Sequence, residues 1–551
     1  KLSDTIFEAM YTAFKNSGKP LSEVWHTPQV INFKRIDAHE SGETKGFSSI
    51  YNHDQEFEGK CLKPAGDILI LLKFMKVNQL PDDLFINPKL SAKLSRQLEE
   101  PLVVASGVLP NWSLQLTKDY FFLFPLETRL FFLQCTSFGY GRLVQLWKNK
   151  VGSTKESNTD DPLQHLGRIT RHKLRVSRET LFLSGLKILD KYGSTASVLE
   201  IEYQGEVGTG LGPTLEFYAC ISREFTRRNL NMWRCENFKS SADVEVPDYV
   251  ETSLFPTPLD PSKDNKRVIE LFRYLGIFVA RSMLDNRILD FYFSRVFFQL
   301  THRRYRTKGK DILVEDIEGG LELLALVDEH LASSLCYLYE NREKASELEQ
   351  MTLTFTLPGL ELDLIENGKD INVTSKNVEE YIKLVLNYTL DVGIRQQLDS
   401  FIEGFSVVFP YSSLLILTPE ELVEMHGRVE EDWSSSTLYA SINADHGYSM
   451  GSNSIHELVS IMSSFERQDR RLFLQFLTGS PKLPIGGFKS LKPRLTVVLK
   501  HPEDGLGPDA YLPSVMTCAN YFKLPKYSSG EMMRSRIVQA MNEGSQAFLL
   551  S

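Results

Sequence analysis

Cysteine is scarce in this sequence, and no two cysteines stand close together. The chain of 551 residues has 6 cysteines, without a Cys-x-x-Cys pair and without a histidine cluster beside any of them. Structural zinc sites use Cys and His at short spacings, so the sequence predicts no such metal site. Isolated thiols also make a poor disulfide framework, which favours a reducing compartment, the cytoplasm or the nucleus.

Excess positive charge and long apolar runs are lacking as well. The 62 Lys and Arg against 71 Asp and Glu leave a net charge of −9, so no overall positive field favours nucleic acid as a partner. The longest apolar stretches, residues 68–75 and 271–284, are interrupted by Lys73 and by Arg273 and Arg281. Neither reaches the roughly 18 uncharged residues of a membrane span. We therefore expect no membrane partner. No signal-peptide pattern opens the chain, and its helical beginning suggests a piece of a longer protein.

What is present is the composition of an ordinary globular protein. Hydrophobic residues make up 42% of the chain, and its length is enough for roughly three or four folding units. A polar stretch without apolar periodicity indicates a linker or loop at residues 150–172. It separates a mainly helical region, 1–149, from a mostly helical lobe at 173–427. A hinge at 428–431 and a small lobe of helices and strands at 432–551 follow, so the predicted fold class is α+β.

A glycine-rich turn at residues 208–212 lies between a strand predicted at 198–203 and a helix that Pro213 opens. It has neither the G-x-G-x-x-G spacing of a dinucleotide site nor the lysine of a phosphate loop. A tight turn that uses the conformational freedom of glycine explains it better. The sequence therefore predicts no bound cofactor here, and none elsewhere.

Leu331, Leu335 and Leu338 fall on one face of a helix predicted at 328–340, at steps of four and three residues. Two interpretations fit such a stripe. The leucines could pack into the protein core, or they could line a groove for a partner's aromatic side chain, and both give the same sequence pattern. Periodicity alone favours core packing, and the residues themselves leave both interpretations open.

Cys518 stands in a short segment between two prolines, after a strand predicted at 495–499 and before a helix at 530–544. The prolines stiffen the segment and reduce the entropy lost in presenting one side chain. A cysteine thiolate attacks esters and thioesters well, and neighbouring cations favour the thiolate. Two lysines follow closely in the sequence, Lys523 and Lys526. A buried structural cysteine is the alternative, and the residues alone do not decide between the two.

Three motifs together resemble the catalytic lobe of HECT-type E3 ubiquitin ligases. They are TGSPKLPIGGF at residues 478–488, LPSVMTCANYFKLP at 512–525 and PKYSS at 525–529. Their order and spacing agree with the family, and the resemblance extends from Lys173 to Ser551. Upstream, FLFPLETR at 122–129 and TSFGY at 136–140 are similar to the region that precedes the HECT domain in the ubiquitin-fusion-degradation branch.

The resemblance implies a bilobal α+β HECT domain, whose N-lobe binds a ubiquitin-charged E2 and whose C-lobe is catalytic. Cys518 is then the nucleophile that accepts ubiquitin as a thioester and passes it to a lysine of a substrate or of another ubiquitin. Phe548 in the tail supports lysine transfer, and Tyr203 contacts a second ubiquitin. Thr517 and Asn520 shape the loop around the cysteine. The E2 groove takes five residues, Leu331, Leu335, Leu338, Tyr381 and Val385.

The sequence departs from the family at Met516, where many members have a histidine two residues before the nucleophile. This position supplies no general base. Deprotonation then depends on matched pKa values of the reacting groups or on a side chain from elsewhere.

The resemblance also implies which proteins meet this chain. Expected partners are the charged E2, ubiquitin as donor and acceptor, and the proteasome. Expected substrates are ubiquitin fusions and proteins that already carry ubiquitin, on which chains, branched ones included, are extended for degradation. A cysteine protease or deubiquitinase is one alternative. It needs a histidine base oriented by Asn or Asp, and the 11 histidines show no such signature around Cys518. A non-catalytic helical adaptor is the other alternative.

Overall fold

The computed structural model describes residues 65–77, 82–152, 169–206, 210–234, 249–250, 252–308, 316–360, 362–428, 432–483, 487–501, 506–517 and 519–544. The chain forms two compact units. One comprises Lys1–Arg168 together with Ser412–Leu417, and the other comprises Ile169–Tyr411 and Thr418–Ser551. Residues 412–417 thus group with the first unit, although they lie within the predicted N-lobe. The other predicted domain boundaries stay predictions.

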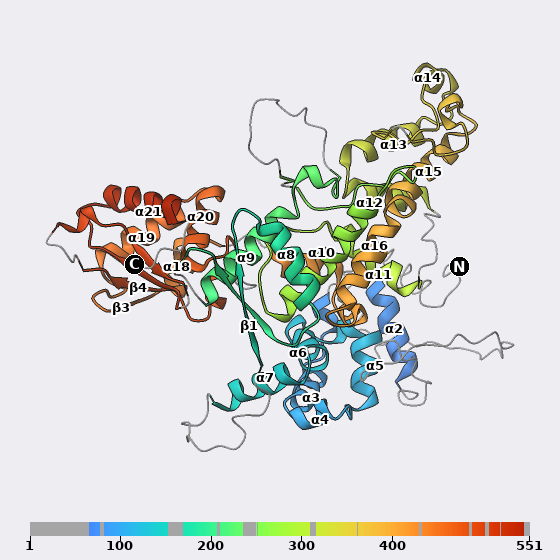
Figure 1. Ribbon diagram of the computed structural model, residues 1–551. Coiled ribbons are helices and arrows are strands. Elements are labelled where there is room, and N and C mark those ends of the chain that lie inside the picture. The colour runs from blue at the N-terminus through green and yellow to red at the C-terminus, as the bar shows by residue number, and fades with distance from the viewer. Residues whose placement is uncertain are drawn as a thin grey trace, which may run out of the picture. The chain divides into compact units, whose positions relative to one another are not determined.

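The first unit is helical in its described part. Helix α3 (Pro88–Leu98) begins where the side chain of Asn87 accepts the N–H of Leu90 at 3.0 Å, with Pro88 in the first turn, which tolerates proline. The remaining α-helices are α2 (Gly66–Val77), α4 (Pro101–Ala105), α5 (Asn111–Asp119), α6 (Leu126–Ser137) and α7 (Tyr140–Gly152) (Figure 1).

Arg129 on α6 fixes the returning segment 412–417 in the first unit. Its buried guanidinium donates from Nε to the carbonyl of Phe124 at 3.0 Å and from Nη1 to the carbonyl of Ile416 at 2.9 Å. Ser137, at the end of the same helix, donates to Oγ of Ser413 at 2.9 Å. Hydrogen bonds from a charged donor are stronger than neutral ones, so α6 holds this segment firmly.

The larger lobe of the second unit contains a two-stranded parallel sheet and several helices. Strand β1 (Arg171–Val176) pairs with β2 (Val198–Tyr203), and β2 alternates between buried and half-buried residues, as its sequence pattern predicts. The surrounding helices are α8 (Leu181–Tyr192), α9 (Leu211–Glu224), α10 (Lys266–Leu284), α11 (Arg295–Arg306) and α16 (Arg395–Ser406).

Helices α10 and α16 approach each other through two glycines. A Cβ atom at Gly276 would meet the carbonyl oxygen of Phe401, and one at Gly404 would meet that of Arg273, at separations that real Cβ atoms do not show. The missing side chains therefore allow the two helix backbones to pack directly against each other.

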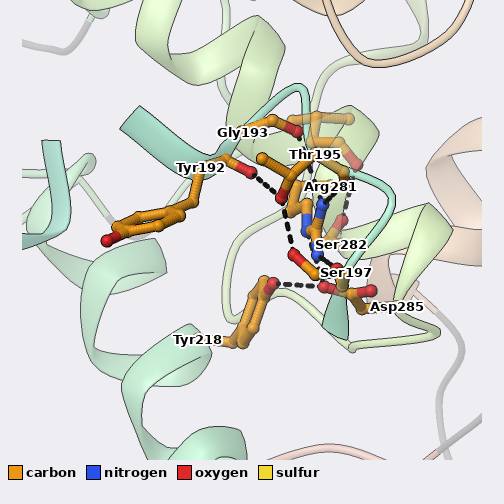
Figure 2. Close-up of polar contacts among 9 residues, drawn as sticks. Tyr192, Gly193, Thr195, Ser197, Tyr218, Arg281, Ser282 and Asp285 are labelled. Carbon is orange, nitrogen blue, oxygen red and sulfur yellow. Dashed lines mark hydrogen bonds and ion pairs between the residues drawn. The ribbon is translucent and has the colours of Figure 1, made fainter. Parts of the chain in front are cut away.

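A buried charged network crosses α10 (Figure 2). Arg281 is fully buried and donates from Nε to Asp285 at 2.7 Å, while its Nη atoms donate to the carbonyls of Thr195, at 2.5 Å, and of Ser197. The hydroxyl of Tyr218 on α9 donates to the same carboxylate at 3.1 Å. A buried guanidinium is stable only when its donors are used. Here they fix the turn between α8 and β2, which explains a charge inside an apolar helix.

A further group of helices in this lobe carries the leucine stripe. Helices α12 (Ile317–Ala325), α13 (Glu329–Glu340) and α15 (Val378–Leu390) pack together, and α14 (Ala345–Gln350) follows α13 (Figure 1). Helix α13 begins at Asp328, whose carboxylate accepts the N–H of Leu331 at 2.8 Å and a bond from Arg234 at 2.6 Å. The start of α13 is therefore fixed by a cap and an ion pair.

The small lobe has a four-stranded sheet in the order β3-β4-β6-β5. Strands β3 (Asn443–Asp445), β4 (Thr496–Leu499) and β6 (Tyr521–Leu524) are parallel, and β5 (Ser514–Met516) is antiparallel to β6. Its helices are α18 (Ser435–Ser441), α19 (Asn453–Ser463), α20 (Arg467–Thr478) and α21 (Gly530–Gly544). Aliphatic residues make up most of the core, and Trp433, Phe473 and Phe522 are among its aromatic members. The strand predicted at 495–499 and the helix at 530–544 are confirmed, whereas β5 and β6 were not predicted.

The chain leaves the larger lobe through helix α17 (Pro419–Val423). A capping box between Thr418 and Glu421 stabilises the N-terminus of this helix. A π-helical turn, Glu424–Arg428, follows it. The rest of the predicted hinge, 429–431, lies outside the described residues. In the described part of the chain, no helix combines the length and the apolar character that crossing a bilayer requires.

Candidate active site

The predicted nucleophile belongs to the connection between β5 and β6. Cys518 itself lies outside the described residues, but the chain on both sides of it is described. Met516 pairs with Tyr521 across the two antiparallel strands, which leaves residues 517–520 as the connection. The N–H of Ala519 donates to the carbonyl of Met516 at 3.1 Å. The described residues on both sides of Cys518 are therefore linked to each other at the end of a hairpin.

Asn520 anchors this turn to the chain that enters β4. Its φ of +51° lies in the left-handed region, which asparagine tolerates better than most residues. Its buried side chain donates from Nδ2 to the carbonyl of Pro493 at 2.7 Å, and its own carbonyl accepts the N–H of Thr496 at 3.0 Å. The N–H of Asn520 also reaches the carbonyl of Thr517 at 3.5 Å. These bonds support the loop-shaping roles that the resemblance implies, and the roles themselves stay predictions.

Residues of the PKYSS motif form hydrogen bonds to residues 509–511, which precede strand β5. The carboxylate of Asp509 accepts from the backbone N–H of Ser528 at 2.9 Å and from its hydroxyl at 2.6 Å, and these bonds lower the pKa of Asp509. The hydroxyl of Tyr527 donates to the carbonyl of Tyr511 at 2.8 Å. The motif therefore fixes the backbone on the approach to the cysteine, a function that its sequence alone did not reveal.

The sheet topology determines which charged residues accompany the cysteine. Because β4 and β6 are parallel, the turn before β6 lies at the edge where both strands begin. Lys526, which follows β6, belongs to the opposite edge, and Lys523 lies within β6. Two exposed cations that the sequence did not single out, Lys492 and Arg494, stand on either side of Pro493 instead. Predicting them requires the pairing of β4 with β6.

The predicted E2 groove brings its residues together on α13 and α15, but mostly below the surface. Leu335 is 1% exposed and Tyr381 3%, and the Tyr381 ring packs edge-on against Phe355 with centroids 5.5 Å apart. Leu338 and Val385 are also buried, and Leu331 is half-buried. Core packing accounts for this arrangement, and the E2 assignment stays a prediction.

Apolar side chains are nevertheless exposed on and around α13. Tyr337 on the helix is 46% exposed, and Met351 after α14 is 40% exposed. Leu326, which precedes the helix, is also exposed. These side chains, together with the half-buried Leu331 of the predicted stripe, offer apolar surface to a partner.

Tyr203 lies in a compact charged cluster. It is 2% exposed, the guanidinium of Arg178 lies 4.0 Å from its ring centroid, and burial raises the pKa of its hydroxyl. Arg178 also pairs with Glu206 at 2.5 Å and with Glu216 at 2.8 Å. A second ubiquitin would find little of the Tyr203 ring in this arrangement, and that role stays a prediction. Phe548 lies outside the described residues.

Other side chains in the described part offer little competing chemistry. Among the described residues, no group of three or more His, Cys, Asp or Glu side chains is placed to hold a metal ion. Burial, with a contribution from Glu216, raises the pKa of Cys220 to about 12, so that thiol stays protonated at neutral pH.

The sequence has close relatives among known proteins. It is 55% identical over 563 residues to Ubiquitin fusion degradation protein 4 of Saccharomyces cerevisiae, covering 100% of this chain and 38% of that protein. It is 42% identical to a probable ubiquitin fusion degradation protein of Schizosaccharomyces pombe, covering 99% of this chain and 34% of that protein. It is 37% identical to the E3 ubiquitin-protein ligase TRIP12 of Danio rerio, covering 86% and 24%. The chain thus spans well under half of the length of these relatives.

The match to a protein family covers the lobes that contain the leucine stripe and the cysteine turn. Residues 219–551 match the HECT-domain (ubiquitin-transferase) family. This range includes all three motifs on which the resemblance was based. The chain therefore belongs to the HECT family of ubiquitin transferases.

Proposed function

We propose that this chain is the catalytic part of an E3 ubiquitin ligase that carries ubiquitin on Cys518. The family match across residues 219–551 is the observation on which the proposal rests. The turn around Cys518 supports it, because Asn520 and the PKYSS motif anchor the backbone on both sides of the cysteine. A fixed turn presents one sulfur at low entropic cost.

The first step is an exchange between two thioesters. The Cys518 thiolate attacks the carbonyl carbon of the E2–ubiquitin thioester, a new C–S bond forms, and the E2 cysteine leaves as a thiolate. The bonds made and broken are of the same kind, so the step depends on bringing the two sulfurs together more than on acid–base help. Met516 is exposed at the position of the absent histidine and supplies no base.

The second step forms an isopeptide bond. A neutral lysine amine attacks the thioester carbonyl, the C–N bond forms, and the Cys518 thiolate leaves. The amine must lose its proton before or during the attack, which requires a base or an environment that lowers the pKa of the lysine.

We further propose that the exposed apolar side chains on and around α13 contact the E2. Tyr337 is the largest of them, and exposed aromatic residues often dominate interface energies. The buried leucines beneath would then act by supporting the helix.

The substrates we propose are ubiquitin fusions and proteins that already carry ubiquitin, because two relatives bear ubiquitin fusion degradation in their names. Proteasomal degradation in the cytoplasm or nucleus would follow. A ubiquitin fusion incubated with this chain, E1, E2 and ATP should gain ubiquitin faster than the same protein without its ubiquitin. Equal rates would reject this substrate class.

The proposal is tested on a non-reducing gel after brief incubation with E1, E2, ATP and ubiquitin. The wild-type chain should gain one ubiquitin that a thiol reductant removes, and Cys518→Ala should gain none. Cys220→Ala is the matched control, since this half-buried thiol lies on α9, and it should behave as wild type. A hydrolase would instead release free ubiquitin, and an unchanged adduct on Cys518→Ala would reject the proposal.

A further inference from the structure

The chain that enters β4 has an unusual charge distribution for an acidic protein. Residues 487–501 contain four cations, Lys489, Lys492, Arg494 and Lys500, and no Asp or Glu, although the whole chain carries −9. The side chains of Lys489, Lys492 and Arg494 are exposed. Residues 487–501 therefore supply no carboxylate of their own to these cations, although Asp432 from another segment interacts with Lys489.

Lys492 and Arg494 differ from the exposed cations of strand β1, which are paired with carboxylates. Arg171, Lys173 and Arg175 form ion pairs with the glutamates of β2. Within the described residues, neither Lys492 nor Arg494 forms a side-chain ion pair or hydrogen bond. Their charges are therefore available to a group from another molecule.

These two cations are connected to the described residues on either side of Cys518 through one hydrogen bond. They flank Pro493, whose carbonyl accepts the bond from Asn520, and Asn520 closes the turn that contains Cys518. A turn of four residues keeps every member within a few residue lengths of that bond, roughly 10 Å. We call Lys492 and Arg494 the basic rim.

We propose that the basic rim binds carboxylates next to the acceptor lysine, so that this chain prefers lysines in acidic surroundings. The inference rests on the proposed function, because it names the class of acceptor for the second step. An acceptor lysine is itself a cation when it approaches, and the rim repels it unless neighbouring carboxylates offset that repulsion. Charge complementarity of this kind raises the rate of encounter and selects among partners.

The test uses the full chain with ubiquitin already loaded on Cys518 and with further loading stopped by removal of ATP. Two peptides serve as acceptors, each with one lysine, flanked by two Glu on each side in one and by Gln in the other. We expect the Glu peptide to discharge the wild-type thioester about 3- to 10-fold faster, since each exposed ion pair contributes modestly. The preference should shrink toward equality in about 0.5 M salt, because screening weakens exposed pairs.

The double variant Lys492→Glu/Arg494→Glu should reverse this preference in favour of the Gln peptide. Lys526→Glu is the control, because it makes one such Lys-to-Glu reversal, half the charge change of the double variant, at the opposite edge of the sheet and should leave the preference intact. Loading of Cys518 by the E2 is measured for each variant. Loading at the wild-type rate shows that the small lobe is still folded.

The outcomes separate this inference from the proposed function. If the wild-type chain forms no reducible adduct on Cys518, both are rejected. If the adduct forms normally but the two peptides discharge it at equal rates, the proposed role of the basic rim is rejected and the proposed function is not. The same holds for a Glu preference that survives in the double variant, or a double variant that slows both peptides by the same factor.

Discussion

At the scale of single residues, Asn520 determines the geometry of the turn that contains Cys518. It occupies a backbone conformation that alanine disfavours, and its side chain makes the buried bond to Pro493. A left-handed conformation costs a non-glycine residue about 1–2 kcal/mol, and the loss of a buried hydrogen bond costs about 1 kcal/mol more. Thr517 contributes its carbonyl, which accepts the N–H of Asn520 at 3.5 Å.

Asn520→Ala should therefore slow the transfer of ubiquitin from E2 to Cys518 about 10-fold, because the backbone next to the cysteine loses its anchor to Pro493. Single-turnover transfer, followed on non-reducing gels, measures this rate. Asn286→Ala is the matched control, because Asn286 has a φ of +53° but lies after α10 in the other lobe. Asn520→Gly separates the two causes, since glycine restores the backbone conformation without the side-chain bond. Wild-type transfer by Asn520→Ala would contradict this role.

The same scale shows why sequence could indicate the nucleophile but not its charged surroundings. Cys518 stands out by its flanking prolines and by the motifs around it. Lys523 and Lys526 are closest in sequence, yet the strand carries Lys526 to the far edge of the sheet. Lys492 and Arg494 come to the turn only through the pairing of β4 with β6. Proximity in this lobe follows strand pairing more than sequence distance.

At the scale of elements, the π-helical turn Glu424–Arg428 buries a histidine where the chain leaves the larger lobe. Nδ1 of His426 lies 2.6 Å from the carbonyl of Leu422, which can only accept, so Nδ1 carries the proton. Nε2 is buried and has no hydrogen-bond partner in the described part of the chain. Burial lowers the pKa of His426 from 6.5 to about 4.

This histidine should make the folded state sensitive to acid. Because its pKa is lower in the folded than in the unfolded state, its contribution is complete above pH 6.5 and declines as the pH falls toward 4. The free energy of unfolding should drop by about 2 kcal/mol from this group between about pH 7.5 and about pH 5. Urea unfolding at several pH values, compared between wild type and His426→Phe, measures the difference. The exposed His330→Phe should retain the wild-type pH dependence, and a His426→Phe profile identical to wild type would refute this account.

Helix α13 gives a second prediction at this scale. Leu335 is 1% exposed, so an acid there would disturb packing and would not distinguish docking from folding. Tyr337→Asp changes a side chain on the exposed face of α13. It should slow E2-dependent loading about 10-fold, because an exposed aromatic residue at an interface often contributes much of the binding energy. Raising the E2 concentration should restore the rate. Tyr140→Asp is the matched control, because Tyr140 is 50% exposed in the first unit. Unchanged loading of Tyr337→Asp would place the E2 elsewhere.

Elements with strong periodicity or clear ends were predictable from sequence, and short strands were not. Helix α21 and strand β4 follow from their own patterns. Strands β5 and β6 have three and four residues, and their conformation depends on pairing with each other and with β4. The leucine stripe on α13 was predicted as a pattern, but its burial depends on α12 and α15, which no local sequence reveals.

At the scale of the whole molecule, the two proposed steps divide between the two lobes of the second unit. The exposed face of α13 belongs to the larger lobe, and the cysteine turn belongs to the small lobe. The proposed loading of Cys518 requires these two surfaces to come together. The transfer rate is therefore a property of both lobes and of their connection.

The central claim, that one sulfur carries ubiquitin, is tested most directly by mapping the adduct. The full chain is mixed briefly with charged E2, trapped in acid so that thioesters persist, digested and analysed by mass spectrometry. The account predicts that the C-terminal remnant of ubiquitin is attached to the peptide containing Cys518 and is lost on treatment with a thiol. A remnant attached to Cys135, Cys220 or Cys336 instead, or one that thiol treatment does not remove, would contradict it.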